Sequence, residues 1–158
     1  MKRLILFIIF TLTSCGFSPI NNSDTQTRSV AIEFSNNPLN NYFFNEIKKN
    51  RYLLKFDFVT SNEADLIIEI KNHRIGKFLG AGDQNFFSAT GNLEYELEMK
   101  ITDTEKNESE SFKLFTSENY AYDTDSILSN EKKIDEIKTT FFMQAISQLS
   151  FFLTSRDL

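Results

Sequence analysis

Strict alternation of apolar and charged side chains over residues 93–101, within a strand predicted at residues 91–101, constrains the fold of this 158-residue chain more than any other feature. Successive side chains of a β-strand point to opposite faces of a sheet, so this segment has one apolar and one polar face. The pattern is typical of an antiparallel sheet that is covered on one side and open to water on the other. The apolar positions are Leu93, Tyr95, Leu97, Met99 and Ile101, and the positions between them are Glu94, Glu96, Glu98 and Lys100.

Three more segments have the pattern of strands. Residues 30–34 alternate in the same way. A strand that begins at Phe112 and extends toward Tyr122 follows a polar turn at residues 103–109, which predicts a hairpin with the strand before it. Residues 64–77 form the remaining strand. Its two faces are expected to carry Leu66, Ile68 and Ile70 on one side and Ile67, Glu69, Lys71 and His73 on the other.

Two segments have the period of helices. Asn37 is a favourable N-cap residue, and Pro38 suits the first helical position because its missing N–H would have no partner there. We expect this helix to end near Asn50. The second helix is predicted from about Ser126 to Leu153 and would be about 40 Å long. Its apolar stripe, with spacings of three and four, consists of Ile134, Ile137, Phe141, Ala145, Leu149 and Phe152.

The order of these elements is β-α-β-β-β-α. Two helices that each carry one apolar stripe can cover a single face of a sheet, which gives a two-layer arrangement. The sequence therefore predicts an α+β domain at residues 30–158, in which a four-stranded antiparallel-type sheet packs against two helices.

The first 15 residues have the organisation of a bacterial lipoprotein signal. Lys2 and Arg3 precede the apolar run at residues 4–10, which is far shorter than the roughly 20 residues of a membrane-spanning helix. The segment Leu12-Thr13-Ser14-Cys15 has the lipobox pattern, and Cys15 is the one cysteine of the chain, so no intramolecular disulfide can form. We therefore predict a signal peptide at residues 1–14 and a lipidated Cys15 that begins a polar tether at residues 15–29.

The charge and the composition argue against two classes of protein. Loss of Lys2 and Arg3 leaves 15 basic and 22 acidic side chains, a formal charge of −7, which disfavours nucleic-acid binding. His73 is the one histidine, and no Ser/His or Cys/His pair can be assembled with it, so an enzyme is not expected. No cofactor or metal is expected either. The acidic run at residues 94–98 is best explained as the solvated face of its strand.

Two basic clusters are the candidate binding residues. Lys71, Arg74 and Lys77, with His73 among them, lie toward the end of the second predicted strand. Lys132 and Lys133 lie in the first turns of the last helix. Lysine and arginine form charge-assisted hydrogen bonds with phosphate, so these side chains could contact a phosphorylated ligand. Simple solvation of surface charges is the alternative.

The chain resembles the LptE family of lipopolysaccharide-assembly lipoproteins. The order of the elements is similar, and so are several short motifs with their spacing along nearly the whole mature chain. These motifs are Cys15-Gly16-Phe17-Ser18-Pro19, Glu94-Tyr95-Glu96-Leu97, Tyr120-Ala121-Tyr122-Asp123, Ile127-Leu128-Ser129-Asn130-Glu131 and Ala145-Ile146-Ser147-Gln148-Leu149.

The resemblance implies a function without bond chemistry. Members of the family plug the outer-membrane β-barrel LptD as a 1:1 complex, assist its folding and help to assemble lipopolysaccharide at the cell surface. By resemblance the chain would be lipid-anchored in the outer membrane on its periplasmic side, as Gly16 at the sorting position also implies. It would contact lipopolysaccharide, with Lys71, Arg74, Lys77, Lys132 and Lys133 as candidates.

Two positions depart from the family pattern. A basic residue near the start of the last helix is replaced by Asn130, and another before the third strand falls in the segment Phe87-Ser88-Ala89. A different class remains open: a lipid-anchored periplasmic module that binds a small ligand or peptidoglycan in a concave pocket.

Overall fold

The computed structural model describes residues 27–80, 90–123 and 125–156. The predicted signal peptide, Cys15 and all but the end of the predicted tether lie outside these residues, as does the segment 87–89. The described elements are β1 (Arg28–Glu33), α2 (Pro38–Lys49), α3 (Arg51–Leu54), β2 (Phe56–Phe58), β3 (Leu66–Leu79), β4 (Thr90–Asp103), β5 (Glu108–Ala121) and α4 (Ile127–Ser155).

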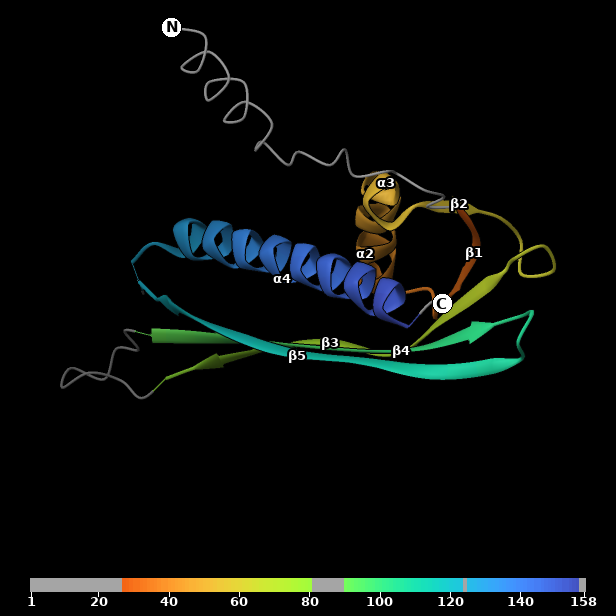
Figure 1. The fold of residues 1–158 in the computed structure, drawn as a ribbon. Coiled ribbons are helices and arrows are strands. Elements are labelled where there is room, and N and C mark those ends of the chain that lie inside the picture. Colours follow the sequence, from red (N-terminus) through yellow and green to blue (C-terminus); the bar gives the residue numbers. More distant parts are fainter. Residues whose placement is uncertain (1–26, 81–89, 124, 157–158) are drawn as a thin grey trace, which may run out of the picture.

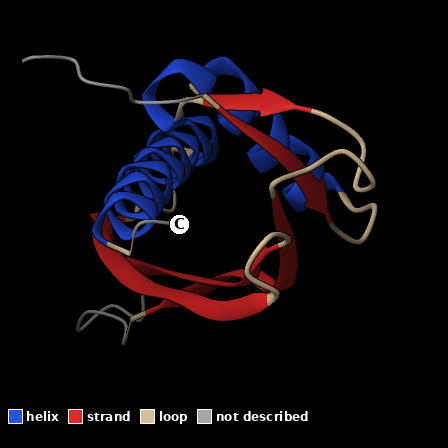
Figure 2. Ribbon diagram, turned by 45° about the vertical axis from the view of Figure 1, so that its right-hand side comes forward, coloured by secondary structure: helices blue, strands red, loops and turns tan. Residues whose placement is uncertain are grey.

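The strands form one sheet in the order β2-β1-β3-β4-β5. β3, β4 and β5 form a long antiparallel meander, whereas β1 is parallel to both β2 and β3. The helices lie on one side of the sheet, which curves around them (Figures 1 and 2). The α+β class and the helix-covered sheet were predicted. The prediction of four strands and two helices was wrong, because the sheet has a fifth strand, the short β2, and the fold has a third helix, the short α3.

The parallel pairing of β1 follows from its connections. Parallel neighbours need a crossover between them, and α2 provides it for β1 and its neighbours β2 and β3. Asn37 accepts a 2.9 Å hydrogen bond from the backbone N–H of Asn40, and Pro38 is the first helical residue, so the predicted helix start is confirmed. At the other end, Lys55 has φ of 55°, a left-handed conformation that ends α3 and turns the chain into β2.

A β-bulge at Lys71 changes which side chains of β3 face the helices. The register passes from Ile70 opposite Met99 to Asn72 opposite Glu98, so one residue of β3 has no counterpart in β4. His73 is consequently opposite Leu97, on the inner face. The prediction that His73 shares the face of Glu69 and Lys71 was wrong, because a single extra residue reverses the alternation beyond it.

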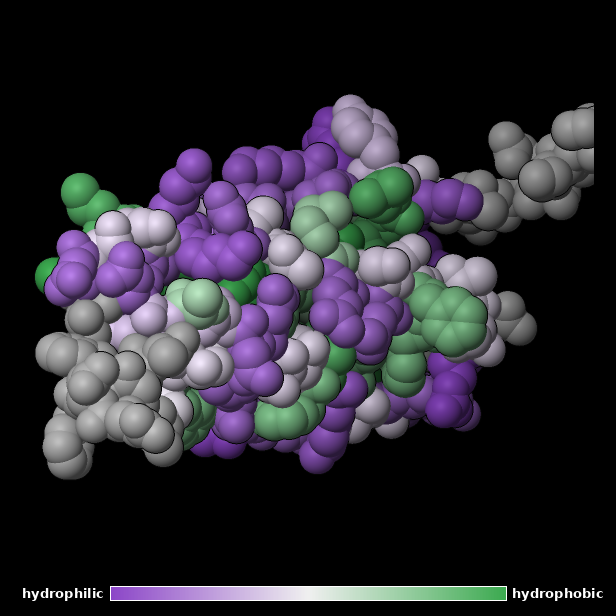
Figure 3. Space-filling model, turned by 90° about the vertical axis from the view of Figure 1, so that its left-hand side faces the viewer, coloured by the Kyte–Doolittle hydropathy of each residue, from purple (hydrophilic) through white to green (hydrophobic). Residues whose placement is uncertain are grey.

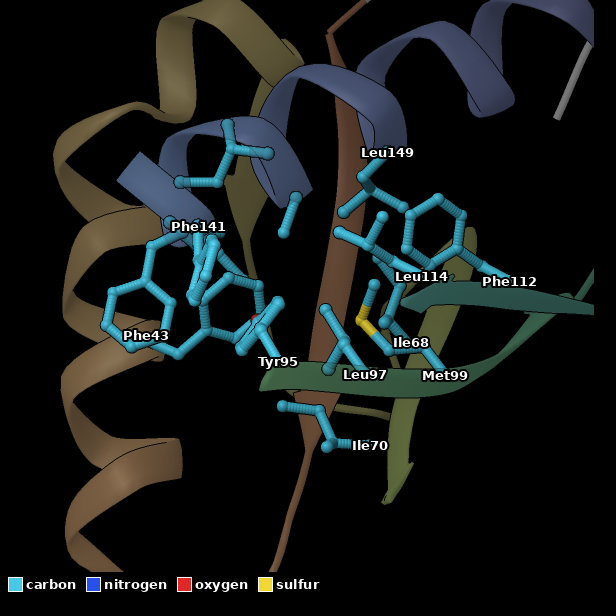
Figure 4. Close-up of a cluster of buried hydrophobic side chains, with 14 of the residues drawn as sticks. Phe43, Ile68, Ile70, Tyr95, Leu97, Met99, Phe112, Leu114, Phe141 and Leu149 are labelled. Atoms are coloured by element: carbon cyan, nitrogen blue, oxygen red, sulfur yellow. The ribbon is translucent and has the colours of Figure 1, made fainter. Parts of the chain in front are cut away.

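The core lies between α4, α2 and the inner face of β3–β5. The aromatic rings of Tyr95 and Phe141 stack at 5.6 Å between centroids with an interplanar angle of 20°. Phe43 and Phe142 pack beside them, and aliphatic side chains of the three strands fill the rest (Figure 4). The predicted stripe of α4 is confirmed, with Phe152 partly buried and the other five members buried.

The outer face of the sheet carries polar side chains and no helix. Glu98 and Lys113 form an ion pair of 2.9 Å across β4 and β5, and Glu96 pairs with Arg74 of β3. The side-chain amide of Asn92 donates a 2.8 Å hydrogen bond to the side-chain oxygen of Asn119. The prediction of one buried and one polar face is therefore confirmed. No described helix is both long enough and apolar enough to span a bilayer.

Candidate binding surface at the distal end of the sheet

Three strand ends and the start of α4 meet at one end of the domain, which we call the distal end. Leu79 of β3 pairs with Gly91 of β4, and Thr90 pairs with Ala121 of β5. The chain then turns back, and α4 begins at Ile127 above the same end (Figure 1). This end lies opposite the one where the helix finishes.

The distal end carries large apolar side chains in water together with cations. Phe78, Leu79, Ile127 and Leu128 are all at least half exposed. The ammonium of Lys77 lies 5.7 Å from the centre of the Tyr122 ring, a distance that allows a cation–π interaction. A surface that combines exposed apolar groups with lysines suits an anionic amphiphile, such as a lipid with phosphates.

The structure separates the predicted basic residues into two groups. Lys71 and Arg74 lie along β3 and are paired with Glu69, at 2.5 Å, and with Glu96. Their charges are therefore balanced by carboxylates of the sheet.

The other three lysines lie toward the distal end. Lys77 is opposite Leu93 and therefore on the inner side of the sheet, below α4. Lys132 and Lys133 are exposed on the first turns of α4, and neither forms an ion pair with another described residue. Their charges are available to a ligand.

The exposed apolar residues of the distal end were not singled out by the sequence analysis. Ile127 and Leu128 precede the buried stripe of α4, and Phe78 and Leu79 follow the regular part of β3. Each looks like an extension of an apolar pattern that faces the core. They form a surface only because they lie at the end of the sheet, where none of the described elements covers them.

Asn130 joins α4 to the end of β5. Its side-chain amide donates a 2.5 Å hydrogen bond to the carbonyl of Asp123, and its side-chain oxygen accepts a 3.0 Å bond from the Asp123 N–H. The residue is buried. The position at which the resemblance implies a basic residue therefore has a structural function here and does not face a ligand.

Replacement of Asn130 by alanine should lower the free energy of unfolding by about 1–3 kcal/mol, because this buried side chain makes two hydrogen bonds to the Asp123 backbone that alanine cannot make. Urea denaturation followed by circular dichroism measures the change. The control is Lys133→Ala on the same helix, which should leave stability within about 0.5 kcal/mol of the parent. Equal stability of the two variants would show that Asn130 does not join the elements.

Gly91 allows Tyr120 to close this end of the sheet. A Cβ atom on Gly91 would lie 2.2 Å from the Tyr120 Cζ atom, so any other residue would displace the ring. Tyr120 is buried, and burial raises the pKa of its hydroxyl. The Tyr120-Ala121-Tyr122-Asp123 motif thus fills the sheet end with Tyr120 and places Tyr122 beside Lys77.

His73 does not belong to the basic surface. Its Nδ1 lies 2.7 Å from the side-chain oxygen of Asn40, and its ring packs against Phe43 and Tyr95 at 5.1 and 5.4 Å. The buried Nε2 has no hydrogen-bond partner among the described residues. Loss of hydration lowers the pKa of His73 to about 4, so the ring is neutral near pH 7. The prediction that His73 lies among the basic side chains was wrong, because the bulge at Lys71 turns His73 to the inner face of the sheet.

Chemical groups for metal binding do not gather in the described part of the chain. No set of three or more histidine, cysteine, aspartate or glutamate side chains there is arranged to hold an ion.

The fold matches solved structures of bacterial lipoproteins, although no protein-family profile and no curated sequence matches the chain significantly. Rare lipoprotein B from Shewanella oneidensis is 14% identical, with a TM-score of 0.62 over 82% of this chain and 96% of that chain. A minor lipoprotein from Acinetobacter baumannii is 12% identical, with a TM-score of 0.65 over 84% and 95%.

A third structure, of lipoprotein B from Nitrosomonas europaea, is 14% identical, with a TM-score of 0.56 over 82% of this chain and 86% of that chain. Each match covers most of the solved chain, so the similarity concerns the whole arrangement of helices and strands. The described domain therefore has the fold of these lipoproteins.

Proposed function

We propose that this chain is an outer-membrane lipoprotein with an LptE-like function. In this proposal Cys15 carries the lipid anchor, and the domain plugs the barrel of an LptD-type protein on the periplasmic side. It supports the delivery of lipopolysaccharide to the outer surface by binding and templating, without catalysis. The observation that carries the proposal is the fold shared with rare lipoprotein B and its relatives. The lipobox at residues 12–15 agrees with it.

The outer face of the sheet is suited to a wet lumen. The interior of an outer-membrane barrel is polar, so a plug must present polar surface to it. Ion pairs such as Glu98–Lys113 and the joined amides of Asn92 and Asn119 give this face hydrogen-bonding groups in place of an apolar patch. Phe115 is the one large apolar side chain among the exposed hydrophobic residues of the described β4 and β5.

The distal end is the proposed site of lipopolysaccharide contact. Lys77, Lys132 and Lys133 would meet phosphates, and the exposed apolar side chains beside them would meet acyl chains. Lys71 and Arg74 are less suited to this role because glutamates already balance their charges.

Site-specific photo-crosslinking in cells tests the barrel partner. A photoreactive phenylalanine analogue at Phe115 reports what lies against the outer sheet face, and mass spectrometry identifies the product. We expect a 1:1 adduct with a large outer-membrane barrel. The control is Cys15→Ala with the same probe, which should remain folded but lose both membrane fractionation and the adduct.

Other outcomes of these experiments would contradict the proposed plug function or the lipid anchor. If the lipidated protein is a monomer in detergent and Phe115 yields no barrel adduct, the plug function is wrong. A specific small molecule that copurifies with such a monomer would favour the alternative, a lipid-anchored binding module. Unchanged membrane fractionation of Cys15→Ala would contradict the anchor.

A further inference from the structure

The segment Lys48-Lys49-Asn50-Arg51-Tyr52-Leu53-Leu54-Lys55 departs from the charge balance of the chain. It contains four cations and no acidic residue, in a protein whose formal net charge is −5. It covers the end of α2, the whole of α3 and the turn into β2, and all four cations are exposed. Tyr52, between them, is 77% exposed, and the Arg51 guanidinium lies 5.0 Å from its ring centre.

An apolar groove continues this surface onto α4. It has a volume of about 370 Å³ and lies between Leu53 of α3 and Met143 and Phe151 of α4. Phe151 is 75% exposed, whereas Leu149 and Leu153 of the same helix are buried. The Ser150 hydroxyl donates a 3.3 Å hydrogen bond to the Leu53 carbonyl, which fixes α3 beside α4. Seen from the left-hand side of Figure 1, the surface is mostly polar, and its apolar side chains lie in separate patches (Figure 3).

This surface adjoins the point at which the chain enters the domain. The backbone N–H of Arg28, the first residue of β1, donates a 2.9 Å hydrogen bond to the Lys55 carbonyl. Thr27 is therefore next to α3, and Cys15 lies twelve positions before it. Twelve residues extend at most about 40 Å. If Cys15 carries lipid, as proposed above, the anchor holds the basic and apolar surface within that distance of the bilayer.

Lys49 is paired with Glu46 at 2.6 Å, so its charge is already balanced. We propose that Lys48, Arg51, Tyr52, Leu53 and Phe151 form a second membrane contact, which lies on the phospholipid bilayer that holds the anchor. Tyrosine and exposed aliphatic or phenylalanine side chains partition into the boundary between headgroups and acyl chains. Lysine and arginine next to them are attracted to anionic headgroups. The inference rests on the lipid anchor of the proposed function and does not depend on a barrel.

The contact would orient the domain. The groove lies toward the C-terminal end of α4, at residues 143–154, and the start of the helix at Ile127 is about 24 Å from it along the axis. Lys77, Lys132 and Lys133 at the distal end would then be held away from the bilayer. One surface would face the membrane while the other remained accessible.

The chain has no tryptophan, so single substitutions give probes without background. The lipidated full-length variants Tyr52→Trp and Phe151→Trp are reconstituted into vesicles that contain phosphatidylglycerol and phospholipids with brominated acyl chains, which quench nearby indoles. Phe115→Trp on the outer sheet face and Leu128→Trp at the distal end are matched controls, because all four positions are well exposed.

We expect the fluorescence of Tyr52→Trp and Phe151→Trp to shift to shorter wavelength and to be quenched several-fold more strongly than that of the controls. Adding Leu53→Glu to Tyr52→Trp should abolish the quenching. Equal quenching at all four positions, or none at the first two, would overturn the proposal. If neither tryptophan is quenched in vesicles but both become buried when a barrel is bound, the surface is a protein interface and the proposal is also overturned.

The quenching and crosslinking experiments together separate this inference from the proposed function. The vesicles contain no barrel, so strong quenching without a barrel adduct at Phe115 would support the membrane contact and reject the plug. A barrel adduct at Phe115 without quenching would support the plug and reject the membrane contact.

Discussion

Replacement of Phe141 by alanine is expected to lower the free energy of unfolding by about 3–5 kcal/mol. The side chain is 2% exposed and stacks on Tyr95, which joins the middle of α4 to the middle of the sheet. Its removal takes away apolar contact and leaves a cavity that the long helix and the three-stranded meander cannot close. Denaturation by urea, followed by circular dichroism, measures the loss.

The matched control for this prediction is Phe151→Ala. It makes the same chemical change in the same helix at a position that is 75% exposed, so stability should change by less than about 1 kcal/mol. If the two variants were equally stable, the contact of Phe141 with the sheet would not contribute to folding. Phe151→Ala should also reduce membrane contact, which the denaturation experiment does not detect.

The stability of the domain should fall by about 3 kcal/mol as the pH falls from about 6.5 to about 4, through His73 alone. In the unfolded chain the imidazole takes up a proton below its ordinary pKa of 6.5, but burial lowers the pKa of His73 in the folded protein to about 4. Within this window the unfolded state binds the additional proton, so stability is greatest above 6.5 and decreases as the pH falls. Below about 4 both states are protonated and the loss is complete.

Urea denaturation at a series of pH values checks this expectation. The comparison variant is His73→Gln, whose amide can still donate to Asn40 but cannot titrate. Since the chain contains no other histidine, the difference between the parent and the variant should show the dependence above pH 4.5. A parent whose stability stays flat between pH 6.5 and 4.5 would contradict the burial of a neutral His73.

Long elements with a clear period were predictable from the sequence. The alternation at residues 91–101 defines β4, and the stripe through Phe141 and Leu149 defines the buried side of α4. In both cases many side chains carry the same signal, so a local exception does not hide it. The cap at Asn37 was also predictable, because it depends on two adjacent residues.

Short and irregular elements were not predictable for a physical reason. β2 has three residues and is stabilised by its pairing with β1, a contact between segments about 28 positions apart. The bulge at Lys71 depends on how β3 pairs with β4, so the sequence of β3 alone does not reveal it. It reversed the face of His73, and it explains why a histidine that looks exposed in the sequence is partly buried on the inner face.

The candidate sites divide in the same way. The sequence located lysines near the ends of elements but could not show that glutamates of β3 and β4 balance two of the basic residues. It also could not show that Leu53 and Phe151, 98 positions apart, line one groove. Such surfaces depend on which elements become neighbours, which is decided by the packing of the whole domain.

The place of β1 in the sheet has a mechanical consequence. β1 is the first described strand, yet it lies inside the sheet with parallel strands on both sides. A pulling force applied at Arg28 acts along two ladders of hydrogen bonds at once and loads them in shear, so the bonds must break together. An edge strand would instead peel away one bond at a time. The domain is therefore built to resist tension from the side on which its tether begins.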